Sequence, residues 1–252
     1  MELDLEKRRI SLIDADSIIY VCHWDAMSKS WDKPLTEICN SVDKVISKIL
    51  IETKATHYLG FYGAGKSFRF NYYPDYKGNR KKLEPLPYIG RIKEYMNEIW
   101  EFIPTNHLEA DDCVNICKNN LQNSTICAID KDLLSLEGTH FNYKKFEWVT
   151  TTKDEAYVQF WKDMLIGQPG DNIKGIPKKG EKAADLILES TTETSDDSLF
   201  RSLVFENYIS YFGEEEGINE FYKNYKCLKI LDKSDSFTIP NPVKVKTEQL
   251  VI

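Results

Sequence analysis

The sequence has no apolar run that approaches the ~20 residues a helix needs to cross a membrane. Its start, Met-Glu-Leu-Asp-Leu-Glu-Lys-Arg-Arg, also lacks the apolar segment of a signal peptide. Both absences argue against a membrane-spanning protein and against a secreted one. We therefore expect a soluble, intracellular protein that has no membrane partner.

Cys-x-x-Cys pairs, which are typical of zinc and redox sites, are missing although the chain contains six cysteines. A chain of 252 residues can bury a sizeable core and does not need disulfides to fold. Cys113 and Cys117 lie one helical turn apart, but no pair of histidines accompanies them. We expect free, mostly buried thiols that pack in the core.

The chain also lacks the excess of basic residues that many nucleic-acid-binding proteins carry, because its net charge is −7. The distribution of charge matters more than its sum when the partner is a polyanion. Basic residues gather in the stretches 77–82 and 174–182. Taken alone, each stretch is as typical of solvated surface lysines as of a nucleic-acid interface.

Short apolar runs at residues 9–14, 55–61 and 124–130 predict buried strands. Between the first two, apolar residues of the segment 36–51 recur at helical spacing. Strand, helix and strand in succession indicate a parallel sheet with crossover helices. The fold class that follows is α/β, with a twisted, mainly parallel central sheet flanked by helices.

The second half of the chain is predicted to be helical after a β-ribbon at 139–150. Thr152 and Glu155 form the pattern of a capping box and open a helix that runs through about residue 166. Amphipathic patterns continue at 181–190, 198–212 and 214–230. We expect one domain over residues 1–150, a helical region over 151–232, and an extended or disordered tail over 233–252.

Residues 60–67 (Gly-Phe-Tyr-Gly-Ala-Gly-Lys-Ser) match the phosphate-binding pattern G-x-x-x-x-G-K-[ST]. Such a loop must also open a helix whose N-terminus receives the phosphates. The following residues 68–73 alternate and are aromatic, and Pro74 closes them, which predicts a strand and a turn. We therefore interpret Gly63 and Gly65 as turn glycines between two strands.

Acidic residues recur where strands end or helices begin, which is where open α/β sheets collect ligand-binding groups. They are Asp14, Glu109, Asp111, Asp112, Asp130, Asp132 and Asp171. Any single one is more often a cap or a turn former. Asp132 returns to the side of Asp130 if the backbone between them stays extended. As a group, these carboxylates would repel one another unless divalent cations offset their charge, and all-oxygen ligation favours Mg²⁺ or Mn²⁺.

Five segments, taken in order, resemble the bacteriophage and bacterial 5′-nucleases, the family of flap endonucleases and 5′→3′ exonucleases with a PIN-like fold. The segments are residues 12–16 (LIDAD), 76–80 (YKGNR), 109–112 (EADD), 130–132 (DKD) and 167–184 (GQPGDNIKGIPKKGEKAA). The resemblance covers about residues 10–184, and it is the order and spacing of the segments that make it specific.

By this resemblance the chain is a metal-dependent 5′ nuclease that hydrolyses phosphodiester bonds of DNA in replication or repair. It would act as a 5′–3′ exonuclease, a structure-specific 5′-flap endonuclease or both, and RNA in RNA–DNA hybrids is a further substrate to test. The acidic group would hold two Mg²⁺ or Mn²⁺ ions, and Asp14 and Asp130 would take part in catalysis. Lys77 and Arg80, called the basic gate below, would lie beside the scissile phosphate. Tyr76 would stack on an exposed base.

The resemblance also implies a helix-hairpin-helix element at about residues 164–188 that grips one strand of a DNA duplex through backbone amides. That element is similar to sites that hold K⁺, and its glycines would let the backbone approach phosphate. The residues expected to contact DNA beside the gate and Tyr76 are Lys81, Lys82, Lys174, Gly175, Lys178, Lys179, Gly180 and Lys182. The protein would be a cytoplasmic monomer, in the host cytoplasm if a phage encodes it.

Three positions depart from the family pattern. Residues 59–61 read Leu-Gly-Phe where an acid is usual near the end of the second strand. Gln168 stands at an acidic position, and Lys178 replaces a glycine of the hairpin. The gateway between Arg80 and Glu109 is also short for a full helical arch. The number of metal ions therefore stays open at this stage.

Two alternatives stay open, and the first follows from these departures. The chain would be a module that binds branched DNA with weak or lost catalysis if the missing acids are essential. A PIN-type ribonuclease that acts on single-stranded RNA is the other alternative, although it gives the hairpin no duplex to hold.

Overall fold

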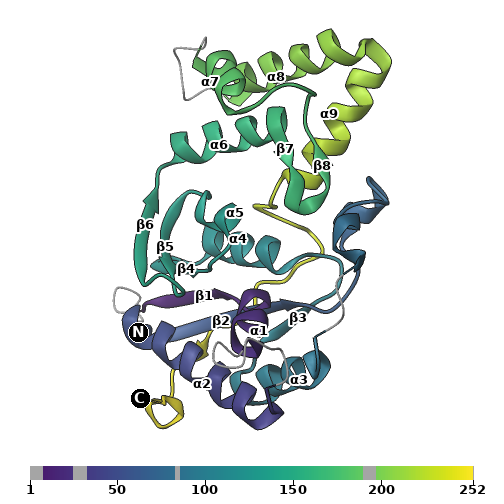
Figure 1. The fold of residues 1–252 in the computed structure, drawn as a ribbon. Coiled ribbons are helices and arrows are strands. Elements are labelled where there is room, and N and C mark those ends of the chain that lie inside the picture. The colour runs from purple at the N-terminus through teal and green to yellow at the C-terminus, as the bar shows by residue number, and fades with distance from the viewer. Residues whose placement is uncertain (1–7, 25–32, 83–85, 190–196, 252) are drawn as a thin grey trace. The chain divides into compact units, whose positions relative to one another are not determined.

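A computed structural model describes residues 8–24, 33–82, 86–189 and 197–251 of the chain (Figure 1). These residues form two compact units. Unit 1 contains the described parts of Met1–Lys66, Glu84–Thr151 and Ile230–Ile252, and unit 2 those of Ser67–Leu83 and Thr152–Lys229. Among the helices of these ranges, none combines the length and the apolar character that a membrane crossing requires.

Unit 1 is built on a sheet whose strand order is β3-β2-β1-β4-β5-β6 (Figure 1). The strands are β1 Ile10–Asp14, β2 His57–Gly63, β3 Ile103–Thr105, β4 Ser124–Cys127, β5 Gly138–Asn142, β6 Glu147–Thr151 and β9 Val243–Lys244. The pairs among the first five strands are parallel, while β6 and β9 pair antiparallel with β5 and β2. The predicted α/β fold with a mainly parallel sheet is thereby confirmed.

Helices cover both faces of this sheet, which explains why every residue of β1 is buried. One face carries α1 Asp16–His23, α2 Leu35–Glu52 and α3 Ile89–Trp100, and the other carries α4 Ala110–Asn120 and α5 Lys131–Leu134. Alternate residues of β1 divide between the two layers: Leu12 packs toward α4, and Ile13 packs toward α1 and α2. The helix predicted over 36–51 is α2, and its apolar spacing forms the buried stripe.

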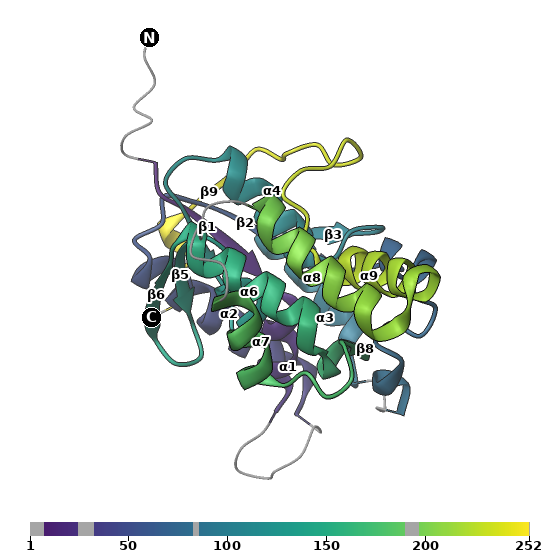
Figure 2. The ribbon, with the colours of Figure 1, turned by 90° about the horizontal axis from the view of Figure 1, so that it is seen from above.

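Unit 2 is helical. It contains α6 Lys153–Ile166, α7 Glu181–Glu189, α8 Asp197–Phe212 and α9 Glu214–Leu228. Between α6 and α7 lie the short paired strands β7 Gly167–Gln168 and β8 Ile173–Lys174, joined by the 3-10 turn η4 Pro169–Asp171. Figure 2 shows α8 beside α6, and the core between α6, α8 and α9 is rich in aromatic residues such as Trp161, Tyr208 and Phe221. The predicted capping box of Thr152 and Glu155 is present.

The strand predicted over 68–73 is wrong, because these residues form the 3-10 turn η2 Phe68–Asn71 of unit 2. Ser67 accepts the backbone N–H of Arg69 and caps the turn. The Arg69 guanidinium donates to the backbone oxygens of Cys227 and Lys229 at 2.9 Å each, at the end of α9. The aromatic residues thus fill a core instead of alternating along a strand. Residues 60–67 open no α-helix, as expected, and are not a phosphate-binding loop of that type.

The segment after Leu231, expected to be extended or disordered, is extended and packs on unit 1 up to Val251. Strand β9 pairs with the first half of β2, and the 3-10 turn η5 Thr247–Gln249 follows. Phe237 contacts Phe61 edge-to-face, with ring centroids 6.0 Å apart. The Val251 backbone N–H donates to Ser47 Oγ at 2.9 Å.

Candidate metal and nucleic-acid site

Asp14 is the last residue of β1 and lies at the carboxyl edge of the unit 1 sheet. Its side chain is 3% exposed. One carboxylate oxygen, Oδ1, accepts the backbone N–H of Asp16 and the other, Oδ2, accepts the hydroxyl of Ser17, both at 3.1 Å. Tyr143 donates its hydroxyl to the Asp14 backbone oxygen. The strand end and the start of α1 are therefore tied together through this one carboxylate.

Burial raises the pKa of Asp14 from 3.8 to about 7, and the negative charges of Asp16 and Asp130 act in the same direction. The hydrogen bonds from Ser17 and from the Asp16 amide lower the pKa in part. Both charged groups that act on Asp14 are thus carboxylates. A divalent cation with oxygen ligands would relieve this repulsion.

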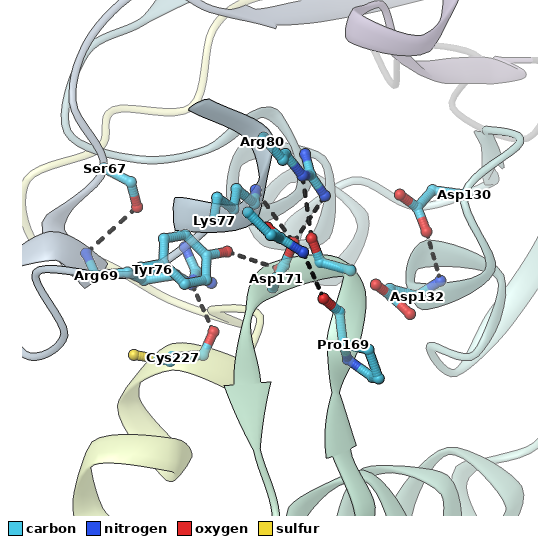
Figure 3. Close-up of polar contacts among 12 residues, drawn as sticks. Ser67, Arg69, Tyr76, Lys77, Arg80, Asp130, Asp132, Pro169, Asp171 and Cys227 are labelled. Atoms are coloured by element: carbon cyan, nitrogen blue, oxygen red, sulfur yellow. Dashed lines mark hydrogen bonds and ion pairs between the residues drawn. The ribbon is translucent and has the colours of Figure 1, made fainter. Parts of the chain in front are cut away.

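Asp130 and Asp132 follow β4, the neighbour of β1. The backbone between them does not stay extended, so the condition set for Asp132 in the sequence analysis is not met, because Asp130 is the N-cap of α5. Its Oδ1 accepts the backbone N–H of Asp132 at 3.0 Å (Figure 3). The cap places both residues at the carboxyl edge, where the first turn of α5 favours negative charge.

Glu109, Asp111 and Asp112 begin α4, which starts at the same edge because it follows β3 and leads to β4. Glu109 and Asp112 form a reciprocal capping box. Asp112 is fully buried, and its two oxygens accept the backbone N–H groups of Glu109 at 3.0 Å and Leu231 at 2.9 Å. The structure therefore gives Asp112 a positioning task, whereas Glu109 and Asp111 are half-buried.

Within the described part of the chain, no three acidic, histidine or cysteine side chains converge closely enough to form a ready metal site. Phe61 is in register with Asp14 on the neighbouring strand and is fully buried. The end of β2 therefore contributes an apolar side chain at this level of the sheet.

Asp171 lies in unit 2 and binds the basic gate (Figure 3). Its Oδ2 accepts the hydroxyl of Tyr76 at 2.9 Å, and its Oδ1 accepts Arg80 Nη2 at 2.8 Å. Lys77 Nζ lies 4.0 Å from Oδ1, and the Lys77 backbone N–H donates to the Asp171 backbone oxygen at 2.9 Å. The sequence predicts Asp171 as a metal ligand. In the structure its carboxylate contacts Lys77 and Arg80, the side chains that are predicted to face the phosphate.

Further backbone contacts fix the gate segment to the turn between β7 and β8. Asn79 Nδ2 donates to the Pro169 oxygen at 2.7 Å, and Arg80 Nε donates to the Gly170 oxygen at 3.1 Å. Asn172 Nδ2 donates to the Asp75 oxygen at 2.9 Å. Hydrogen bonds therefore join segments that lie about 90 residues apart in the chain within unit 2.

Tyr76 does not have the exposure that base stacking needs, because it is 2% exposed. Its ring packs edge-to-face on Phe70, with centroids 5.6 Å apart, and joins a core cluster with Ile173 and Cys227. The sequence-based stacking role for this residue is therefore not supported, and its hydroxyl serves Asp171 instead.

Glycine is favoured at two positions of the hairpin, 175 and 178, for different physical reasons. Gly175 is buried, and a Cβ there would collide with the backbone of Leu165, Ile166 and Gly167. Its predicted approach to phosphate does not agree with this packing. Lys178 has φ +65°, a left-handed conformation in which glycine is unstrained, which explains why glycine is usual at this position.

The lysines expected to contact DNA are mostly exposed in unit 2. Lys174, Lys178 and Lys182 are exposed, Lys179 is half-buried, and Gly180 is exposed where α7 begins. The side chains of Lys81 and Lys82 lie outside the described residues. Gln168 forms part of β7 and pairs with Ile173.

Two residues in contact with these groups were not identified from the sequence. Asp16 receives the Gly63 backbone N–H on both carboxylate oxygens at 3.1 Å. The signal for Asp16 was present, because it closes the segment 12–16 on which the resemblance rests. Lys93 of α3 donates to the Gly63 backbone oxygen, and no local pattern pointed to it.

Comparison with known proteins agrees with this geometry. A family model described as "5'-3' exonuclease, N-terminal resolvase-like domain" matches residues 9–161. The flap endonuclease Xni of Pseudoalteromonas translucida (strain TAC 125) is 28% identical over 226 residues, which cover 78% of this chain and 86% of the relative. DNA polymerase I of Bacillus subtilis (strain 168) is 27% identical over 214 residues, and the match covers 73% of this chain but 23% of that protein.

Two solved structures share the fold. The T5 D15 protein co-crystallized with metal ions superposes with a TM-score of 0.62 at 16% identity, and the alignment covers 89% of each chain. The catalytic core of Rad2 in complex with a DNA substrate gives a TM-score of 0.51 at 13% identity, over 91% of this chain and 77% of the other. The resemblance drawn from the five sequence segments is confirmed. The chain therefore belongs to the 5'-3' exonuclease family, and residues 9–161 are its N-terminal resolvase-like domain.

Proposed function

We propose that this chain is a metal-dependent 5′ nuclease that hydrolyses DNA at a 5′ end, a flap or a duplex junction in replication or repair. Family membership supports the enzyme class. The observation that carries the metal dependence is Asp14, a buried carboxylate that faces the charges of Asp16 and Asp130 at the carboxyl edge. A buried carboxylate that other carboxylates influence stays ionised more readily when a divalent cation offsets the charge.

The residues that would hold two Mg²⁺ or Mn²⁺ ions are carboxylates at the carboxyl edge of unit 1. They are Asp14, Glu109, Asp111, Asp130 and Asp132, with Asp112 orienting the start of α4. When bound, such ions supply an activated water and offset the charge on the leaving 3′ oxygen of an in-line displacement. The α4 and α5 caps hold their carboxylates in place beforehand, which lowers the cost of ordering them.

The basic gate would stabilise the negative charge that develops on the phosphate. Arg80 keeps about half of its side chain exposed, at 52%, while Asp171 and the Gly170 oxygen fix its guanidinium plane. Lys77 is held through its backbone N–H, so its ammonium can move toward a phosphate without loss of that anchor. We assign Asp171 the task of positioning the gate.

The hairpin between α6 and α7 would hold one strand of the duplex. Its exposed lysines Lys174, Lys178 and Lys182 would contact phosphates, and the backbone N–H groups at the start of α7, after Gly180, would approach one of them. A K⁺ ion at the hairpin, action on RNA–DNA hybrids, a monomeric state and a cytoplasmic location belong to the same proposal. Assays in K⁺ and in Na⁺, with DNA and hybrid substrates, check the first two.

A single-turnover assay on a 5′-flap DNA tests the proposed function. Cleavage is expected with Mg²⁺ and not with EDTA. Asp130→Asn should abolish cleavage and leave DNA binding within about twofold, because the cap acceptor remains while the charge is lost. Asp154→Asn, at the exposed start of α6, is the matched control for a charge removed from a first helical turn. Undiminished turnover by Asp130→Asn would contradict the assignment.

A module that binds branched DNA with weak or lost catalysis is the second candidate. Phe61 favours it, because an apolar ring stands in register with Asp14 and an acid is usual nearby in the family. Asp112 favours it as well, since two backbone amides occupy its carboxylate. In the same assay this candidate predicts binding of the flap without cleavage at any Mg²⁺ concentration.

A further inference from the structure

The chain makes a tight turn at Lys77, one of the two residues of the basic gate. The Asp75 backbone oxygen accepts the Gly78 N–H at 2.8 Å, which closes a four-residue turn with Lys77 at its third position. Lys77 has φ +53°, and a type II turn requires a positive φ at that position. Glycine or asparagine is usual there, because other side chains are strained in the left-handed region. The lysine that is predicted to face the phosphate therefore has a strained backbone.

Hydrogen bonds hold this strained turn from both sides. The Lys77 N–H donates to the Asp171 backbone oxygen at 2.9 Å, and the Lys77 oxygen accepts the Arg80 N–H at 3.0 Å. A left-handed lysine persists when its surroundings fix it in this way, and such strain is typical of functional sites. The direction of the Lys77 side chain consequently depends on the contacts that keep the turn closed.

Asn172, at the end of η4 in the hairpin between α6 and α7, contacts the first residue of this turn. Its Nδ2 donates to the Asp75 backbone oxygen at 2.9 Å and to Asp75 Oδ2 at 3.1 Å, and it lies 3.4 Å from the Tyr73 hydroxyl. The Asp75 backbone oxygen is the same atom that accepts the Gly78 N–H. The Asn172 amide therefore binds the acceptor that closes the turn around Lys77.

The hairpin itself does not require the amide group of Asn172. Residue 172 has φ +60°, which glycine adopts without strain, and its backbone N–H donates to the Pro169 oxygen whatever the side chain is. The bonds of the Asn172 amide go instead to residues 73 and 75, about 100 residues earlier in the chain. The amide thus has its use in the segment that leads to the basic gate.

We propose that Asn172 is a positioning residue, which holds the turn Asp75–Gly78 closed and thereby fixes the direction of the Lys77 ammonium. The inference rests on the proposed 5′ nuclease function, in which Lys77 stabilises the charge that develops on the phosphate. Asn172 touches neither the phosphate nor the metal ions in this account, and it acts on cleavage only through Lys77.

A single-turnover assay on a 5′-flap DNA with Mg²⁺ tests the proposal. Asn172→Gly keeps the left-handed backbone and removes the amide, so the cleavage rate at saturating protein should fall about 10- to 100-fold, while flap affinity stays within about twofold. Asn123→Gly is the matched control, because Asn123 has φ +54° in the turn between α4 and β4, and it should cleave as the wild type does. In a Lys77→Ala background, Asn172→Gly should cause almost no further loss, since the two residues act as one unit.

Amide hydrogen exchange gives a readout that does not depend on activity. In Asn172→Gly the Lys77 and Gly78 N–H groups should exchange at least about tenfold faster than in the wild type, because the turn opens more often. Unchanged protection of the N–H groups of α9 should show that unit 2 is still folded. Equal exchange at Lys77 and Gly78 in both proteins would contradict the proposal.

The outcomes separate this inference from the function on which it rests. If the wild-type chain does not cleave the flap, the proposed function fails and the role of Asn172 falls with it. If the wild type cleaves and Asn172→Gly cleaves equally fast, only the role of Asn172 is overturned. A loss that is as large in the Lys77→Ala background as in the wild type would show that Asn172 supports unit 2 in general, and it would also overturn the proposal.

Discussion

Asp14 connects the chemistry of the site to the stability of the fold. Its carboxylate is buried among hydrogen-bond donors that suit an anion, yet the two charged groups that act on it are also anions. A divalent cation bound at this edge would therefore offset the repulsion between these carboxylates. Residues with this conflict are typical of functional sites, where local stability is given up for chemistry.

The raised pKa of Asp14 predicts how the metal-free protein responds to pH. Between its ordinary pKa of 3.8 and the folded-state value of about 7, the folded chain binds more protons at this group than the unfolded chain does. The free energy of unfolding should therefore fall as pH rises from about 4 to about 7, by up to ~4 kcal/mol from this group. Asp14→Asn should raise the thermal midpoint in EDTA at pH 8 and give no such gain near pH 4.

Mg²⁺ supplies the control for that measurement. Added Mg²⁺ should stabilise the wild type at pH 8 and should stabilise Asp14→Asn much less, because a cation offsets the repulsion that the variant no longer has. A thermal shift of Asp14→Asn that is equal at pH 4 and pH 8 would show that the charge of Asp14 is not the cause.

The hairpin between α6 and α7 shows how an element depends on one close backbone approach. Gly175 lies against the backbone at the end of α6, where the Ile176 N–H donates to the Leu165 oxygen at 2.8 Å. The hairpin carries Asp171, and through Asp171 it carries the basic gate. Its geometry is thus expected to influence both duplex binding and cleavage.

Gly175→Ala should destabilise unit 2 and disturb the gate, because a methyl group would meet backbone atoms that cannot move aside. We expect a loss of about 2–3 kcal/mol or more in the free energy of unfolding, together with weaker flap binding. Gly170→Ala is the matched control in the same hairpin, since a Cβ there meets nothing within 4 Å. Urea unfolding and a flap-binding titration measure both effects. Equal stability of the two variants would contradict this account of the hairpin.

Elements whose apolar residues recur at a regular spacing were predictable from the sequence, and the short elements were not. The apolar residues of α2 recur at helical spacing, and those of β1 form a continuous run, so both elements can be predicted from neighbouring residues alone. Strands of two or three residues, such as β3 and β8, contain too few positions to show a period. The aromatic run at 68–73 imitates a strand, because its burial comes from contacts with α9, about 160 residues away.

The candidate site shows the same division between local and distant information. Asp14 and Asp130 could be found because each ends an apolar run. The bond from Leu231 to Asp112 joins residues 119 apart, and that from Arg80 to Asp171 joins residues 91 apart. No pattern within a window of sequence specifies such pairs. The positioning roles of Asp112 and Asp171 consequently emerge only when the chain is folded.

At the scale of the whole molecule, the net charge of −7 and a DNA substrate are compatible if the charges are separated in space. The acidic residues of the proposed metal site lie at one sheet edge of unit 1, and metal ions would offset them. The exposed lysines of the hairpin, Lys174, Lys178 and Lys182, belong to unit 2. DNA affinity should then depend steeply on salt despite the negative total, because each phosphate contact releases counterions.

Lys178→Gly provides a test of that dependence that leaves the backbone intact, since glycine adopts the φ of +65° without strain. The slope of log affinity against log salt concentration should decrease in magnitude by about one, with little change in thermal stability. Lys145→Ala removes an exposed lysine of the turn between β5 and β6 and should leave the slope unchanged. If both variants alter the slope equally, the DNA senses the overall charge of the molecule, and the hairpin is not its main contact.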